Sequence, residues 1–390
     1  MLATHTHTEM RSGFLPDRIV HLHPTRLCNL ACLHCYSESG PKEKAALDLE
    51  TLKRALPLLK AEGYQLVSLS GGEPLVYAPL VPLVDHAHAH GFRVTMITNG
   101  LFSNKRMDEV VSRLDGVAIS FDGLATTHNR LRGRADAFER SCAALARLAD
   151  DGRPVAAAIS LTREAIPDLP DLADHLVGLG AQALQVRPVA LAGRARTMAD
   201  ISSFTAADQA RLYLVVLALQ EELPDRVRVH CDLAPARNLW QQRDAYAALL
   251  ATCALPGAAD PPDQPLADLV NPLVITETGT LKPIAYDFNS YFDVASIETL
   301  SRKHLAYYKH HHLPDLQTLI GGALARLQGT EGLVDWFDYC TRLSEENTRQ
   351  QSRETKNWSM GQPSKPHSMH HPGNTGKVMG TTSRKGQVSH

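Results

Sequence analysis

Three cysteines near the start of the chain constrain its fold and chemistry more than any other feature. Cys28, Cys32 and Cys35 form a C-x3-C-x2-C run just after a short apolar segment. Thiols this close in sequence do not readily form unstrained disulfides with one another, but they can surround one metal centre. Cysteine thiolates are the usual protein ligands of iron–sulfur clusters. Three of them would leave one iron of a four-iron cube free to chelate a small molecule.

Two other interpretations of the cysteine triplet remain open from these residues alone. With His34, the three cysteines offer a soft tetrahedral set for zinc, although adjacent His34 and Cys35 are awkward to place in one relaxed site. The three could also be ordinary buried thiols. The sequence that follows the triplet favours the cluster.

Length and composition limit the class of protein. A chain of 390 residues indicates one large domain plus a smaller one. A formal net charge of −2 gives no general attraction to nucleic acid or to anionic membranes, so we expect neither as a partner. The start has no apolar signal core, no run is long enough to span a bilayer, and the cysteines do not resemble a secreted disulfide framework. We therefore expect a cytoplasmic protein.

Strand and helix patterns alternate from residue 18 to residue 189. Apolar segments at 18–24, 65–69, 92–97, 117–121, 155–161 and 183–189 predict strands, and 48–61, 80–90, 105–114, 137–149 and 169–179 predict helices. Strands alternating with helices at this spacing predict an α/β fold with a parallel sheet and right-handed crossovers.

Polar residues follow the predicted strands at their carboxyl ends, where α/β folds bind ligands. Gly71, Gly72 and Glu73 form a tight loop after the second strand, and paired glycines let the backbone approach a ligand closely. Later strands end at Asn99, Ser120, Asp122, Ser160 and Arg187. Each of these residues alone could instead be a helix cap or part of a turn. Together they predict a ring around one mouth of the sheet.

The segment RLCNLACLHCYSESG (residues 26–40), with the GGEP and ISFDG segments, resembles the radical S-adenosylmethionine (radical SAM) enzymes. It is especially similar to the branch with a C-terminal SPASM or twitch domain. The resemblance implies a partial (β/α)6 TIM-like barrel. It also implies one [4Fe–4S] cluster, with Cys28, Cys32 and Cys35 as ligands, and S-adenosylmethionine as cofactors.

The resemblance also implies which residues contact S-adenosylmethionine. The Gly71-Gly72-Glu73 loop would hold the amino group of the methionyl moiety, and Arg187 would lie near the carboxylate or ribose. The remaining implied contacts are Ser120 and Asp122 near the ribose, Ser160 and the Tyr36 backbone near the adenine, and His34 in a usually aromatic slot. Asn99 is added as a cofactor contact because it ends a strand at the same mouth.

The chemistry that the resemblance implies is reductive cleavage of S-adenosylmethionine to a 5′-deoxyadenosyl radical, which takes hydrogen from a substrate. The substrate would be a precursor peptide, with a separate partner protein for its recognition, or a small molecule of cofactor or natural-product biosynthesis. A reducing partner such as flavodoxin or ferredoxin is also implied. The alternative function is a non-catalytic zinc- or iron–sulfur-binding module.

The segment from His128 to Gly133 is predicted to be a basic loop. Similar loops in the family close over cofactor and substrate. Arg130 or Arg132 could pair with a carboxylate there. We expect these arginines to be exposed.

The C-terminal half resembles a SPASM or twitch domain that has lost its cluster ligands. Residues 272–286 predict a hairpin like the one that opens such a domain, but Ile284 and Ala285 follow Pro283 where the family usually has a cysteine. Cys231, Cys253 and Cys340 are far apart and are expected to be buried thiols. Helices are expected at 206–221, near 240–250 and over 300–342.

Four regions are predicted from these patterns. Residues 1–17 are a flexible N-terminus, 18–222 the partial barrel, 223–345 a small α+β extension, and 346–390 a disordered basic tail.

Overall fold

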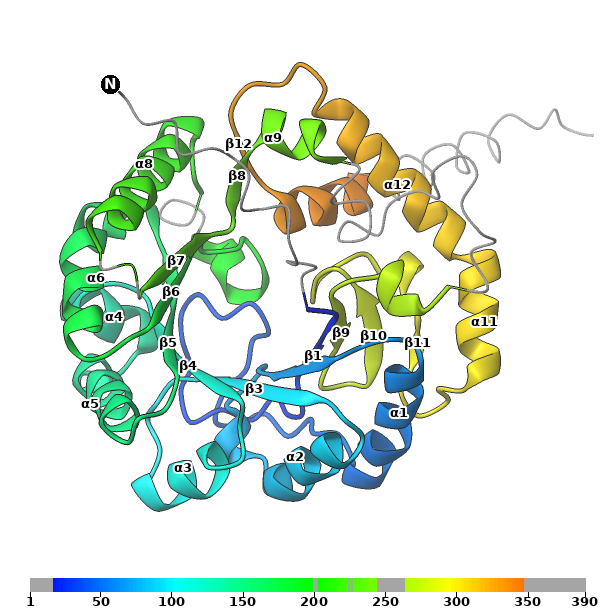
Figure 1. Cartoon of the computed structure of the whole chain (residues 1–390), viewed down its shortest axis with the longest axis horizontal. Coiled ribbons are helices and arrows are strands. Elements are labelled where there is room, and N and C mark those ends of the chain that lie inside the picture. The colour runs from blue at the N-terminus through cyan, green and yellow to red at the C-terminus, as the bar shows by residue number, and fades with distance from the viewer. Residues whose placement is uncertain (1–16, 199–202, 224, 226, 244–263, 347–390) are drawn as a thin grey trace, which may run out of the picture. The chain divides into compact units, whose positions relative to one another are not determined.

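A curved sheet of ten strands is the framework of the described part of the chain (Figure 1). The computed structural model describes residues 17–198, 203–223, 225, 227–243 and 264–346. The strand order in this sheet is β11-β10-β9-β1-β2-β3-β4-β5-β6-β7. The strands are β1 (Ile19–Leu22), β2 (Leu66–Leu69), β3 (Arg93–Thr98), β4 (Gly116–Phe121), β5 (Val155–Leu161), β6 (Ala183–Pro188), β7 (Arg228–Cys231), β9 (Leu273–Ile275), β10 (Thr280–Pro283) and β11 (Ala295–Ser296).

Every neighbouring pair from β9 through β1 to β7 is parallel. Their apolar residues, such as Val20, Leu69, Ile119 and Leu184, are fully buried, as expected for a parallel sheet covered by helices. This confirms the predicted α/β class and the partial TIM-like barrel. The parallel part is longer than the six predicted strands, because β7 and β9 extend it at its two ends.

Helices pack on the outer side of the curved sheet (Figure 1). They start where the sequence supplies caps: the Asp48 side chain accepts from the Thr51 amide, and Thr205 and Asp208 form a reciprocal capping box. The helices are α1 (Leu49–Ala61), α2 (Leu80–Ala89), α3 (Asn104–Val111), α4 (Ala125–Arg132), α5 (Ala137–Asp150), α6 (Leu169–Gly178), α8 (Ala206–Glu222), α9 (Ala236–Gln241), α11 (Arg302–His311) and α12 (Leu313–Arg326).

The C-terminal half continues the barrel sheet. The predicted hairpin is confirmed, because β9 and β10 pair antiparallel across the turn at Glu277–Gly279. The first hairpin strand also pairs with the first strand of the barrel, with Val20 opposite Leu273. One sheet therefore extends across the boundary that we predicted at residue 222.

The predicted helical region 300–342 is wrong in one part. After α12, the chain forms strand β12 (Leu333–Asp335), which pairs with β8 (Leu233–Pro235) in a separate two-stranded sheet. Gly329 and Gly332, both at positive φ, turn the chain out of the helix before this strand. Of the helix predicted near 240–250, residues 240–241 are the end of α9, and residues 244–250 lie outside the described residues.

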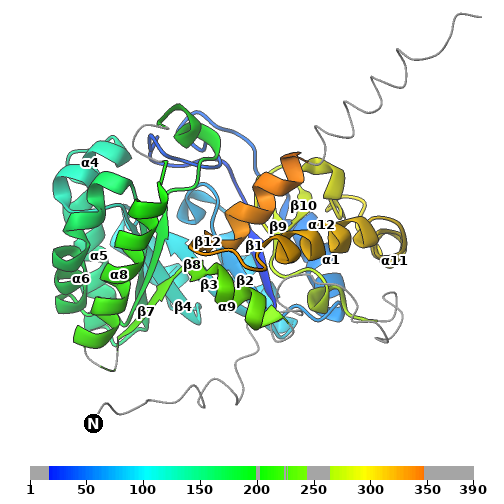
Figure 2. The same cartoon turned by 90° about the horizontal axis from the view of Figure 1, so that it is seen from above.

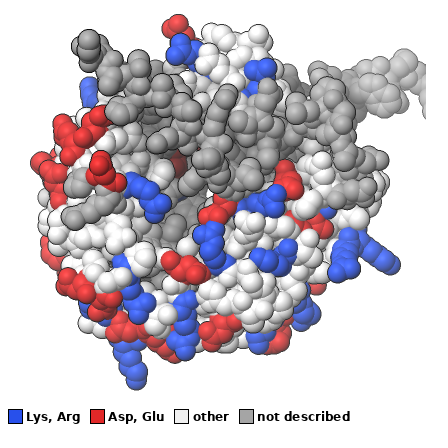
Figure 3. Space-filling view, viewed as in Figure 1, with Lys and Arg blue, Asp and Glu red and all other residues white. Residues whose placement is uncertain are grey.

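The face of the described chain in Figure 3 carries interspersed acidic and basic side chains, in keeping with nearly balanced totals of 42 and 40. None of the described helices combines the length and apolar character that a membrane crossing needs. The predicted tail and the predicted flexible N-terminus lie almost entirely outside the described residues.

Candidate active site

The cysteine loop lies over a cavity at the carboxyl ends of the parallel strands. The cavity has a volume of about 670 Å³ and is lined by Cys28, Cys32 and Cys35. Every other predicted site residue lines it too: His34, Tyr36, Gly71, Gly72, Glu73, Asn99, Ser120, Asp122, Ser160 and Arg187. The ring that the strand ends predicted is therefore assembled in one place. The roles assigned to these residues by resemblance stay predictions.

The glycine pair lets the loop after β2 pack against the cysteine loop. A Cβ on Gly72 would lie 2.3 Å from the Leu27 carbonyl oxygen, and one on Gly71 would lie 2.6 Å from the His23 Cβ. The amides of Gly72 and Glu73 donate to the carbonyls of Thr25 and Leu27 at 2.9 and 3.0 Å. The glycines thus serve a close contact between two protein loops, in addition to any approach to a ligand.

Glu73 is oriented by the end of the neighbouring strand. Its side chain is 1% exposed, and its carboxylate accepts hydrogen bonds from Thr98 Oγ1 at 2.7 Å and from the Asn99 amide at 2.9 Å. Burial raises the pKa of Glu73, while these hydrogen bonds act in the opposite direction. The carboxylate is thereby fixed at the cavity wall, next to the glycine pair.

Asp122 binds protein side chains rather than standing free at the ribose position. It is fully buried, receives a two-point ion pair from Arg132, and accepts from His34 Nε2 at 3.0 Å. Burial alone would raise its pKa, but the charge of Arg132 and the contact with His34 hold that pKa well below the usual range. Asp122 therefore ties the cysteine loop to the end of β4.

The predicted exposed loop from His128 to Gly133 is wrong. These residues end helix α4, with Gly133 as a left-handed C-cap, and His128 and Arg132 are buried. Arg130 faces outward and pairs with Glu164 on the surface. The sequence did not show that Arg132 is buried and Arg130 exposed, because this difference arises only when a helix places residues two positions apart on different sides.

A cluster of aromatic rings from His23, Tyr36 and Tyr286 lines the cavity. The Tyr36 hydroxyl lies 3.2 Å from His23 Nε2, and the His23 ring stacks on Tyr286 with centroids 5.2 Å apart. Tyr286 in turn donates to Glu277 Oε1 at 2.9 Å. Just before it, Ile284 has a left-handed φ of 69°, rare for a branched residue, which turns the chain along the cavity.

The remaining predicted residues differ in how they are engaged. Asn99 Nδ2 donates to Asn29 Oδ1 at 2.8 Å and so supports the cysteine loop. Ser120 and Ser160 stand on β4 and β5 with side chains lining the cavity. Arg187 lies 3.4 Å from the Asp232 carboxylate, which already satisfies part of its charge. No hydrogen bond from a described protein group engages the side chains of these two serines.

The donor set fits an iron–sulfur cluster better than a single ion. Among the described residues, no three His, Cys, Asp or Glu side chains converge on one point as a single zinc ion requires. The thiolates of a cube bind separate irons, so they need not converge. Burial raises the pKa of Cys28 to about 12 and that of Cys32 to about 11, so the free thiols are protonated and a bound metal would replace those protons.

Two buried ring nitrogens also fit a polar cofactor. His23 Nδ1 and His34 Nδ1 are buried without a hydrogen-bond partner among the described residues, and both side chains line the cavity. Buried polar atoms are normally paired, so these two are open to the hydroxyl or amino groups of a ligand. S-adenosylmethionine carries both kinds of group.

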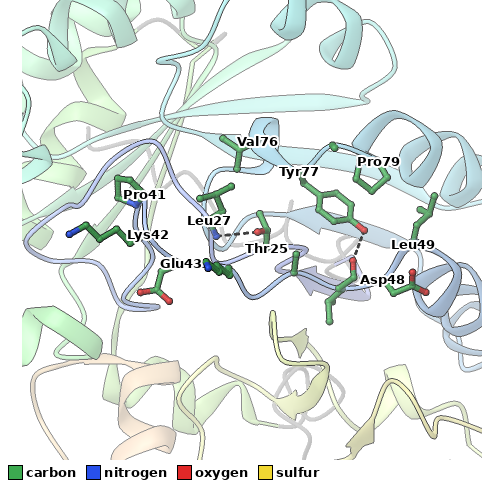
Figure 4. Close-up of a pocket in the computed structure, with 14 residues that line it drawn as sticks. Thr25, Leu27, Pro41, Lys42, Glu43, Asp48, Leu49, Val76, Tyr77 and Pro79 are labelled. Atoms are coloured by element: carbon green, nitrogen blue, oxygen red, sulfur yellow. Dashed lines mark hydrogen bonds between the residues drawn. The ribbon is translucent and has the colours of Figure 1, made fainter.

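A second hollow lies on the outer side of the cysteine loop (Figure 4). It is an open groove of about 820 Å³ between residues 41–49 and 76–79. Leu27 forms part of its wall, and the Tyr77 hydroxyl closes one end by donating to the Leu47 carbonyl at 2.8 Å. None of the predicted site residues lines this groove, so it is separate from the candidate active site.

The C-terminal cysteines are not gathered at the cavity. Cys340 is fully buried in the hydrophobic core, and Cys231 is partly buried against the same core. Neither lines the cavity, and Cys253 lies outside the described residues.

Comparisons with known proteins agree with this site. Residues 22–176 match the family model of the Radical SAM superfamily. The chain is 30% identical over 176 residues to the Antilisterial bacteriocin subtilosin biosynthesis protein AlbA of Bacillus subtilis, covering 44% of this chain and 39% of AlbA. It is 32% identical over 196 residues to the Mycofactocin maturase MftC of Mycolicibacterium smegmatis, covering 48% and 49%. The chain thus spans about half or less of the length of these relatives.

Solved structures share the fold at low sequence identity. Streptococcus suis SuiB bound to S-adenosylmethionine has a TM-score of 0.57 at 16% identity, over 78% of this chain and 68% of SuiB. Native anSMEcpe with bound AdoMet has a TM-score of 0.56 at 14% identity, over 87% and 99%. The family match covers the cysteine loop, the glycine loop and β2 to β5. Residues 22–176 are therefore similar to the Radical SAM superfamily, and the cofactors that go with this similarity are a [4Fe–4S] cluster and S-adenosylmethionine.

Proposed function

We propose that the chain is a radical SAM enzyme that cleaves S-adenosylmethionine reductively and abstracts hydrogen from a substrate. One observation carries the proposal: Cys28, Cys32 and Cys35 open into the same 670 Å³ cavity as the glycine loop and the polar strand ends. The electron is proposed to come from a reducing protein such as flavodoxin or ferredoxin.

The protein's own residues would bind and orient the two cofactors and shield them from water. The three cysteines would ligate the cluster, and Glu73, fixed by Thr98 and Asn99, would face the methionyl amino group. When bound, the two cofactors supply the one-electron cleavage and the radical that takes hydrogen. Arg132 of helix α4 and Asp335, Phe337, Asp338 and Thr341 line the cavity, and such a lining limits the access of water to a reactive species.

We propose a precursor peptide as the substrate. SuiB has been solved bound to precursor peptide SuiA, with a TM-score of 0.50 to this chain, and several relatives are maturation proteins by name. A small molecule is the second candidate, because the Fe-coproporphyrin III synthase of Methanosarcina barkeri is also 30% identical over 155 residues. Product analysis after incubation with peptides or with a porphyrin would separate the two.

The first test is the metal content and the cleavage reaction. Reconstituted without oxygen, the protein is expected to hold about four iron atoms and to release 5′-deoxyadenosine when S-adenosylmethionine and a reductant are added. Changing Cys28, Cys32 and Cys35 together to Ala should abolish both. Cys142→Ala, on helix α5 away from the cavity, is the matched control and should retain both. A loaded cluster without any cleavage would instead support a non-catalytic metal-binding module.

We further propose that the C-terminal half holds no second cluster. Cys340 is fully buried in the hydrophobic core, and Cys231 does not line the cavity. Cys231→Ala and Cys340→Ala are each expected to leave the iron content at about four atoms per chain. A wild-type content near eight, falling to four in either variant, would show an auxiliary cluster.

A further inference from the structure

A single arginine binds the cysteine loop from outside the cavity. Arg194 follows β6 in a short helical turn (η4, Gly193–Met198) that lies beside the loop (Figure 2). Its Nε donates to the Cys32 carbonyl and its Nη2 to the Ser39 carbonyl, both at 2.8 Å. The Arg194 amide donates to the Cys35 carbonyl at 3.0 Å. One residue thus contacts the backbone of two predicted cluster ligands.

The backbone before Arg194 is shaped for this contact. Gly193 has a φ of 50°, and a Cβ there would lie 2.3 Å from the Tyr36 carbonyl oxygen and 2.6 Å from the Cys35 carbonyl oxygen. Only glycine allows the turn to approach the cysteine loop this closely. Two successive residues, Gly193 and Arg194, therefore bring this turn into contact with the cysteine loop.

Among the described residues, no carboxylate offsets the charge of Arg194. All three of its hydrogen bonds go to backbone carbonyls, and in the described part of the chain no Asp or Glu lies within ion-pair distance of it. Arg132 is the other cation that acts on Cys32, but its charge is offset by the ion pair with Asp122. Arg194 therefore contributes the net positive charge on this side of the loop.

We propose that Arg194 is a positioning residue that also raises the reduction potential of the cluster. Reduction adds one negative charge to a centre that already carries thiolate ligands. A nearby uncompensated guanidinium favours that state, since the net charge around a cluster is one of the factors that set its potential. The inference rests on the proposed function, because it presumes that Cys28, Cys32 and Cys35 hold the cluster.

The test is a redox titration of the reconstituted protein, followed by the electron paramagnetic resonance signal of the reduced cluster. Arg194→Gln retains a hydrogen-bond donor but removes the charge. We expect about a tenfold fall in the ratio of reduced to oxidised cluster at a fixed potential, which is about 59 mV for a one-electron couple. Arg194→Lys keeps the charge and should titrate close to the wild type. Arg196→Gln is the matched control, because Arg196 is exposed and pairs with Asp287 and Glu345.

Each possible result either supports or overturns the proposed effect of Arg194 on the reduction potential. An unchanged potential in Arg194→Gln at full iron content would overturn it, as would an equal shift in Arg196→Gln. If Arg194→Gln loses its iron while Arg194→Lys keeps it, the charge is needed for the thiolates to bind the cluster, which supports the inference. If both variants lose iron, Arg194 acts by geometry alone and the electrostatic role is wrong. A wild-type protein without iron would contradict the proposed function instead, since the titration would then have no cluster to measure.

Discussion

Replacing Asp122 by Asn is expected to lower the free energy of unfolding of the cluster-free protein by about 3–5 kcal/mol. The change leaves the largely buried Arg132 guanidinium, which is 9% exposed, without its counter-charge. It also leaves one accepting oxygen where two now serve His34 and Arg132. Urea unfolding followed by circular dichroism measures the difference.

The pH dependence of this effect follows from the direction of the pKa shift. The folded-state pKa of Asp122 is held well below 3.8, its value in an unfolded chain. A carboxyl group with a lowered folded-state pKa contributes its full stability above the unfolded value and loses it as the pH falls. The difference between wild type and Asp122→Asn should therefore be constant near neutral pH and shrink below about pH 4.

Arg130→Gln is the matched control for the buried pair. Arg130 lies two residues from Arg132 on the same helix, but its ion pair with Glu164 is exposed to solvent, with both side chains more than 40% accessible. Exposed pairs contribute about 0–1 kcal/mol, so this variant should unfold almost like the wild type. Equal costs for Asp122→Asn and Arg130→Gln would contradict the view that Asp122 and Arg132 form a buried tie to the cysteine loop.

Replacing Gly72 by Ala is expected to lower the rate of S-adenosylmethionine cleavage by about 10²-fold. The added methyl group would meet the Leu27 carbonyl oxygen at 2.3 Å, and this atom belongs to the backbone next to Cys28. The cysteine loop must shift to relieve the clash, and displacements of about 1 Å cost this much when reacting groups must be aligned. The rate is measured as 5′-deoxyadenosine released per iron-loaded chain.

Gly178→Ala serves as the control for Gly72→Ala. Gly178 ends helix α6, and no atom lies within 4 Å of the position that its Cβ would take. Alanine is also the better helix former, so this variant should keep its activity and gain slight stability. A Gly72→Ala protein that cleaves S-adenosylmethionine at the wild-type rate would show that the two loops are not held in register by this contact.

The sequence indicated the cavity because its signals are local. Each strand is a short apolar run, and the polar residue that ends it projects from the same edge of a parallel sheet. The tripeptide Gly71-Gly72-Glu73 and the three cysteines are likewise motifs that a few neighbouring residues are enough to identify. Site residues that are identified by a short local sequence pattern could therefore be placed before the fold was known.

The contacts that fix the site depend on long-range packing and could not be read in the same way. Arg132 looks like any basic residue near a glycine, and only the helical turn of α4 brings it to Asp122. Arg194 stands among small residues without a motif, and its three carbonyl partners lie more than 150 positions earlier. The pair Gly193-Arg194 is the one signal that could have been noted, as a tight turn shortly after the predicted strand 183–189.

The pairing of β1 with β9 has a consequence for the order in which the chain can fold. During synthesis, β1 leaves the ribosome first and can pair with β2 at once, but its other edge waits for Leu273 to Ile275. Until then the buried apolar strand Ile19–Leu22 presents an open hydrogen-bonding edge, a template for unwanted strand pairing. Completion of the barrel is thus one of the last steps of its folding, and a shortened chain that ends at residue 222 would keep this edge exposed.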